Sequence, residues 1–71
     1  MDIEKISHTV RIERQRRGLT QAALADIAGV SRGRVEALEN DRGMDMGMGT
    51  VRQILSALGY SLTMERSESA S

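Results

Sequence analysis

The sequence contains no cysteine and no proline, and Tyr60 is its only aromatic residue. Without cysteine the chain forms no disulfide and lacks the main ligand of structural zinc sites, and one histidine, His8, cannot hold a metal alone. We therefore expect no metal and no cofactor. A core without phenylalanine or tryptophan has to be built from Ile, Leu, Val, Ala and Met. The absence of proline and the many Ala, Leu, Arg and Glu residues favour an all-helical domain.

The chain also lacks a long apolar run. A signal peptide needs an apolar core of about 7 to 15 residues and a membrane span needs about 20, and the N-terminal region offers neither. We expect a cytoplasmic protein that does not bind a membrane. No Ser/His/Asp or Cys/His set is present, and no pair of carboxylates has an obvious pocket, so we expect no enzymatic activity.

The length of 71 residues and the net charge of zero both limit the function. A core this small buries only about 60% of the surface of the unfolded chain, so a second subunit is the expected source of extra stability. Zero net charge counts against nucleic-acid binding. The charges are unevenly placed, however, because seven arginines fall within residues 11–42 and acids dominate the two ends.

Helical periodicity and capping residues predict three short helices in the first forty residues. They cover residues 2–17, 21–28 and 32 to about 40. Thr20 and Ser31 are good N-cap residues for the second and third helix. Gly29 lies between these two helices and can adopt the positive φ that a tight turn needs.

The remaining sequence predicts a loop, a helix and a strand. The glycine-rich loop covers residues 41–49, and the helix opens at Gly49 or Thr50 and is closed by Gly59. A period-two alternation of apolar and polar residues then indicates a strand, formed by Tyr60, Ser61, Leu62, Thr63 and Met64. A lone strand has an open edge, so we expect two copies to pair across a two-fold axis. We expect residues 66–71 to be a disordered tail, which leaves residues 1–65 as the domain.

Residues 20–40 carry the most specific functional signal. They match two short helices packed at a steep angle around a tight turn. The residues with the type that this packing needs are Leu24, Ala25, Ala28, Gly29, Val30, Val35 and Leu38. The exposed positions of the second of these helices are then Arg32, Gly33, Arg34, Glu36 and Ala37. This arrangement places side chains in the major groove of DNA.

These residues resemble the lambda-repressor-like, or XRE-type, helix-turn-helix family. The resemblance covers residues 6–64 and is carried by Arg14, Gly18-Leu19-Thr20-Gln21, Leu24-Ala25, Gly29-Val30-Ser31, Val35 and Leu38-Glu39-Asn40. It implies an all-α DNA-binding domain of five helices, or of four helices and a loop. It also implies that Gln21 contacts a backbone phosphate and braces the recognition helix, and that Arg14 and Glu39 form a structural ion pair.

The candidate DNA-binding residues are Gln21, Ser31, Arg32, Gly33, Arg34, Ala37 and Arg42. The fork of an arginine matches O6 and N7 of guanine, so we expect Arg32 or Arg34 to read a base, with phosphate contact or a solvated face as the alternative. Ala37 fits a thymine methyl group. Gly33 either lets the backbone approach DNA closely or is simply tolerated.

Three arginines outside the recognition helix are weaker candidates. Arg42, in the loop after the third helix, is a candidate phosphate contact. Arg16 and Arg17 either contact phosphate or belong to a solvated helix end.

The C-terminal segment resembles the HipB-type antitoxins, since a helix ending Ser-Ala-Leu-Gly is followed at once by the strand Tyr-Ser-Leu-Thr-Met. The resemblance implies a homodimeric repressor of its own operon, with a HipA-like kinase as the toxin partner. A phage-type or stand-alone regulator without a toxin is the alternative. A protein-interaction module that has lost DNA binding is the alternative of another class, because zero net charge and Gly33 leave room for it.

Overall fold

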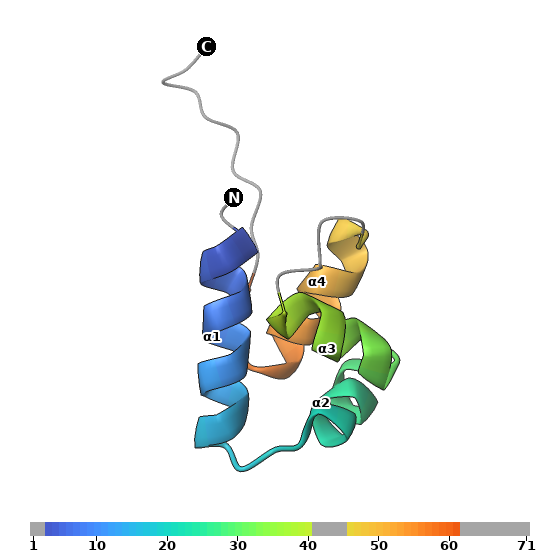
Figure 1. Ribbon diagram of the computed structural model, residues 1–71. Helices are drawn as coiled ribbons and strands as arrows, with labels where there is room; N and C mark the ends of the chain where they lie inside the picture. Colours follow the sequence, from blue (N-terminus) through green and yellow to red (C-terminus); the bar gives the residue numbers. More distant parts are fainter. Residues whose placement is uncertain (1–2, 41–45, 62–71) are drawn as a thin grey trace.

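The computed structural model describes residues 3–40 and 46–61, and within them the chain forms four helices and no strand. The helices are α1 (Ile3–Arg16), α2 (Gln21–Ala28), α3 (Arg32–Glu39) and α4 (Met48–Ala57). Figure 1 shows α1 as the longest element, standing beside a group formed by the other three. The all-helical fold is confirmed for the described residues. Among them, no helix combines the length and the apolar character needed to cross a membrane.

The start of α2 and the turn after it follow the sequence signals. The Thr20 hydroxyl accepts a hydrogen bond from the backbone N–H of Ala23 at 3.0 Å, as an N-cap does. Gly29 has a φ of 73°, in the left-handed region that glycine adopts without steric cost. The backbone N–H of Val30 then bonds to the carbonyl of Ala25 at 3.0 Å and closes the turn. The predicted cap and turn are therefore both confirmed.

The core between the helices is entirely aliphatic, as the composition predicts. It consists of Val10, Leu24, Ala25, Val35, Leu38, Val51, Ile54, Leu55 and Leu58. Ala28 and Val30 are partly buried and pack against this core. The residues that we expected to face inward on the two short helices thus lie in the core or pack against it. This packing leaves the opposite face of α3 toward solvent.

The C-terminal part differs from the sequence prediction in one boundary. The helix α4 begins at Met48, before the predicted start at Gly49 or Thr50. The reason is that the Gly47 carbonyl already accepts from the N–H groups of Thr50 and Val51, at 3.0 and 3.3 Å. Gly47 is the N-cap and has no side chain that could signal a start.

The predicted strand is covered only at its beginning. Tyr60 and Ser61 have no regular secondary structure in this single chain. Leu62, Thr63 and Met64 lie outside the described residues, as do Arg42 and the predicted tail 66–71. The strand and its pairing therefore stay predictions.

Candidate DNA-binding surface

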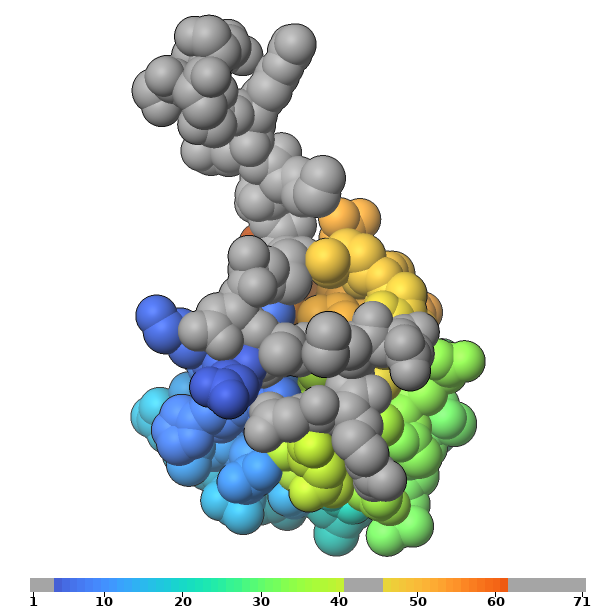
Figure 2. Space-filling model, turned by 45° about the horizontal axis from the view of Figure 1, so that its top comes forward, coloured from blue at the N-terminus to red at the C-terminus, as the bar shows by residue number. Residues whose placement is uncertain are grey.

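The first turn of α3 is exposed to solvent. Ser31, Arg32, Gly33 and Arg34 are all exposed, whereas Val35, Leu38 and Glu39 on the same helix are buried. Figure 2 shows the green atoms of this part of the chain at the outer edge of the molecule. Because the apolar side chains of α3 pack in the core, its N-terminal end is exposed and is available to contact another molecule.

Arg32 and Arg34 are the exposed, positively charged residues of this surface. Neither forms an ion pair with another described residue. An unpaired guanidinium keeps all of its donors for a ligand, and its planar fork fits a guanine edge or a phosphate. The structure thus brings together Ser31, Arg32, Gly33 and Arg34 as one exposed surface. Glu36 and Ala37, which we expected to be exposed as well, are half-buried.

Gly33 is not required by packing within the chain. A Cβ atom placed on it would meet no atom within 4 Å, and its φ lies in the ordinary range. Packing among the described residues therefore does not explain a glycine at this position. Both interpretations from the sequence, close approach to DNA and simple tolerance, agree with this geometry.

The other end of α3 is anchored by a buried ion pair. The Glu39 side chain is only 3% exposed, and its two carboxylate oxygens accept from Arg14, Nε to Oε2 at 2.6 Å and Nη2 to Oε1 at 3.0 Å. The hydrogen bond that Arg14 donates to Glu39 raises the pKa of Arg14 despite partial desolvation, so the guanidinium stays protonated. Arg14 also donates to the carbonyl of Leu19 at 2.7 Å. These contacts give Arg14 and Glu39 a structural role.

Gln21 and Arg11 converge on the same residue of α3. The Nε2 atom of Gln21 donates to Oε1 of Glu39 at 3.3 Å, so Gln21 contacts α3 at its C-terminal end. Arg11 donates to the backbone carbonyl of Glu39 and caps α3. No sequence pattern singles out Arg11, because its acceptor is a main-chain atom 28 residues away.

Arg16 and Arg17 are neighbours in the sequence but differ in the contacts that their side chains make. Both pair with Glu13, at 3.2 and 2.9 Å. Only Arg17 also reaches α4, where its Nη2 atom donates to the carbonyl of Leu58 at 2.8 Å. Arg17 therefore makes a contact between helices, although its side chain is still 42% exposed at the end of α1.

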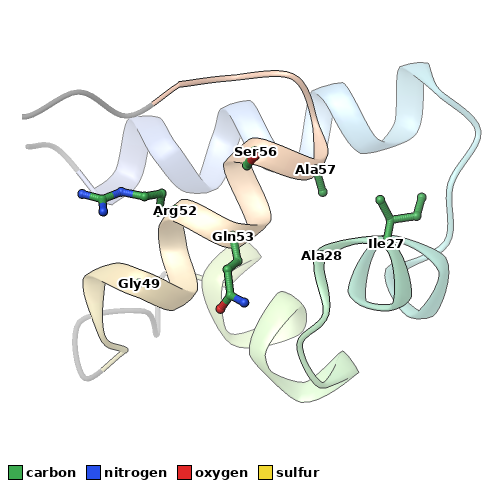
Figure 3. Close-up of a pocket in the computed structure, with 7 residues that line it drawn as sticks. All are labelled: Ile27, Ala28, Gly49, Arg52, Gln53, Ser56 and Ala57. Carbon is green, nitrogen blue, oxygen red and sulfur yellow. The ribbon is translucent and has the colours of Figure 1, made fainter.

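An open hollow of about 500 Å³ lies on another part of the surface, between α2 and α4 (Figure 3). It is lined by Ile27, Ala28, Gly49, Arg52, Gln53, Ser56 and Ala57. None of the candidate DNA-binding residues lines this hollow, so it does not belong to the candidate surface. Within the described residues, no group of His, Cys, Asp and Glu side chains is placed to hold a metal ion.

Comparison with known proteins agrees with this geometry. A family model described as a helix-turn-helix domain matches residues 6–67, which is most of the chain. No curated protein and no solved structure matches the chain. The matched region contains the pair α2 and α3, the tight turn at Gly29 and the exposed start of α3. On this match, the chain belongs to the helix-turn-helix domain family.

Proposed function

We propose that this protein is a transcriptional repressor that binds specific DNA sequences as a homodimer, on an operator that is an inverted repeat. The observation that carries the proposal is the exposed first turn of α3, where Arg32 and Arg34 have no ion-pair partner among the described residues. In a helix-turn-helix protein this turn enters the major groove. Because these two cations lie together there, zero net charge does not prevent a local attraction to DNA.

The other proposed contacts lie around this turn. Ser31 and Gln21, at the starts of α3 and α2, are proposed to bind phosphate, since helix N-termini favour anions. Ala37 is proposed to contact a thymine methyl group, and Arg42 a phosphate. Gln21 donates one amide hydrogen to Glu39, which leaves its second amide hydrogen for the DNA backbone.

Membership of the XRE-type subfamily is part of the proposal. It is supported by the pair Arg14 and Glu39 and by the contact of Gln21 with α3, because the resemblance to that subfamily implies both. We further propose the role of a HipB-type antitoxin that represses its own promoter and binds a HipA-like kinase. Co-purification of the full chain with a kinase encoded beside it tests this role. A stand-alone regulator is expected to retain DNA binding and to capture no such kinase.

The DNA-binding proposal is tested with Arg34→Ala and Arg32→Ala on a duplex selected from a random library with the wild-type protein. We expect at least one of the two variants to lose about 1–3 kcal/mol of binding free energy and to relax specificity at one base position. Arg52→Ala is the matched control, because it removes the same charge from an exposed position on α4 and is expected to bind like the wild type.

Three results of this titration are informative. Equal weakening of Arg34→Ala on every sequence would make Arg34 a phosphate contact. Loss of Arg42 is expected to reduce the salt dependence by about one unit of slope. Absence of any salt-sensitive binding by the wild type on random duplex would reject the repressor and favour a protein-interaction module.

A further inference from the structure

We propose that Arg17 is a positioning residue that fixes the direction in which the chain leaves α4, and with it the spacing of the two recognition helices in the dimer. This inference rests on the proposed homodimer, in which the segment from Tyr60 to Met64 pairs with its copy. It assigns a role to a side chain that lies outside the candidate DNA-binding surface.

The guanidinium of Arg17 bridges two helices that are far apart in sequence. Its Nη1 atom pairs with Oε1 of Glu13 on α1 at 2.9 Å, and its Nη2 atom donates to the carbonyl of Leu58 at the end of α4 at 2.8 Å. Arginine presents its donors in a rigid planar fork. With both sides of the fork occupied, the end of α4 is held at a set position against α1.

The acceptor lies where α4 ends and the next segment begins. Gly59 has a φ of 85°, and the N–H groups of Gly59 and Tyr60 bond back to Ser56 and Leu55, each at 2.9 Å. These bonds satisfy the carbonyls of Leu55 and Ser56, and Arg17 satisfies the carbonyl of Leu58. A cation at this position also matches the negative end of the helix dipole. A Cβ on Gly59 would lie 3.9 Å from Nη2 of Arg17, so the guanidinium lies against the turn itself.

A continuous series of contacts then connects the recognition helix to the dimer segment. The C-terminal end of α3 is tied to α1 by the bonds of Arg14 and Arg11 to Glu39. The same helix α1 is tied by Arg17 to Leu58, two residues before Tyr60. Because Tyr60 begins the predicted strand, a shift at Leu58 changes the position of the strand relative to α3.

Arg16 provides a matched control on the same helix. It pairs with the same carboxylate, Glu13, at 3.2 Å, but its side chain is 72% exposed and none of its described bonds reaches α4. Arg16→Gln and Arg17→Gln therefore remove the same charge beside the same acid. Only the second variant breaks the link to Leu58.

The test compares the full-length wild type, Arg17→Gln and Arg16→Gln on two duplexes. The first is a palindrome selected with the wild type from a random library, and the second carries one additional base pair at its centre. The insertion moves the half-sites apart by about 3.4 Å and rotates one by about 35°. We expect the wild type and Arg16→Gln to lose on the order of tenfold or more in affinity, and Arg17→Gln to lose only about threefold or less.

The ratio of the two affinities is the readout, because a smaller folded fraction lowers both affinities equally. Should Arg17→Gln fail to fold, Glu13→Ala removes the carboxylate that orients Arg17 and is expected to show the same relaxed ratio. An Arg17→Gln ratio equal to that of the wild type would overturn the inference and leave the homodimer standing. A wild type that binds both duplexes equally, and sediments as a monomer, would instead reject the homodimer and the inference with it.

Discussion

At the scale of single residues, the arginines of this chain serve two opposite purposes. Arg14 and Arg17 form ion pairs with Glu39 and Glu13, so these acids are neutralised by cations of the same chain. Arg32 and Arg34 form no ion pair among the described residues and face solvent. This division explains how a chain of zero net charge can present a cationic turn at the proposed DNA-binding surface.

Some of these residue roles were accessible from the sequence and others were not. The exposed Arg32 and Arg34 follow from helical spacing, because the neighbouring apolar residues have to face the core. The bonds of Arg11 and Arg17 end on backbone carbonyls 28 and 41 residues away. Every residue has a backbone carbonyl, so the amino-acid sequence does not indicate which carbonyl accepts such a bond.

Gly33→Ala tests the first turn of α3 at this scale. We expect the free energy of unfolding to rise by up to about 1 kcal/mol, because alanine favours a helix and the added Cβ meets no atom within 4 Å. Urea unfolding measures this change. Gly29→Ala is the control, since its φ of 73° makes a side chain unfavourable and the same method is expected to show a loss.

The same variant separates the two explanations for Gly33 when DNA binding is measured. A loss of affinity in a stabilised protein shows that the backbone approaches DNA closely at this position. Unchanged affinity shows that glycine is merely tolerated. A decrease in unfolding free energy would contradict the open geometry around Gly33.

At the scale of elements, the boundaries with a local chemical signal were predictable. The start of α2 is marked by Thr20 and the turn by Gly29, and both act as the sequence indicates. The start of α4 has only Gly47 as its cap, and glycine offers no hydroxyl or carboxylate to mark a helix start. The predicted strand over Tyr60–Met64 has no partner strand in its own sequence pattern, so the pattern alone does not determine what it pairs with.

Thr20→Ala and Ser31→Ala are expected to differ although both residues are N-caps. The hydroxyl of Thr20 accepts from Ala23, so its loss is expected to cost about 1 kcal/mol of unfolding free energy. Ser31 makes no side-chain capping bond, so Ser31→Ala is expected to cost much less. Urea unfolding of the two variants side by side provides the measurement.

DNA binding is expected to show the reverse order. Ser31 lies exposed at the start of the recognition helix, where the proposed phosphate contact is made. Ser31→Ala is therefore expected to weaken binding more than Thr20→Ala, once both are compared at equal folded fractions. Equal costs in unfolding would show that the hydroxyl of Ser31 caps α3 in solution.

At the scale of the whole molecule, the small aliphatic core is supplemented by polar links between helices. Glu39 connects α3 to α1 and α2 through Arg14 and Gln21, and Arg17 connects α1 to α4. Such links fix the relative positions of helices but add little net stability, because desolvating charges offsets much of the attraction. The additional apolar burial that a chain of this size needs is expected to come from the second subunit.

This expectation leads to a prediction about concentration. If folding and dimer formation are coupled, the midpoint of thermal unfolding rises with protein concentration, because mass action favours the associated state. Leu62→Pro removes a backbone N–H from the middle of the predicted strand and is expected to abolish this dependence. Ser69→Pro, in the tail beyond the strand, is the control and is expected to behave like the wild type.

The same pair of variants extends the prediction to DNA. Wild type and Ser69→Pro are expected to bind a palindrome far more tightly than a single half-site, because two linked recognition helices engage successive major grooves about 34 Å apart. Leu62→Pro is expected to bind the two duplexes with similar, weak affinity. A wild type that binds a half-site as tightly as the palindrome would show that one copy suffices, and the strand would then need another role.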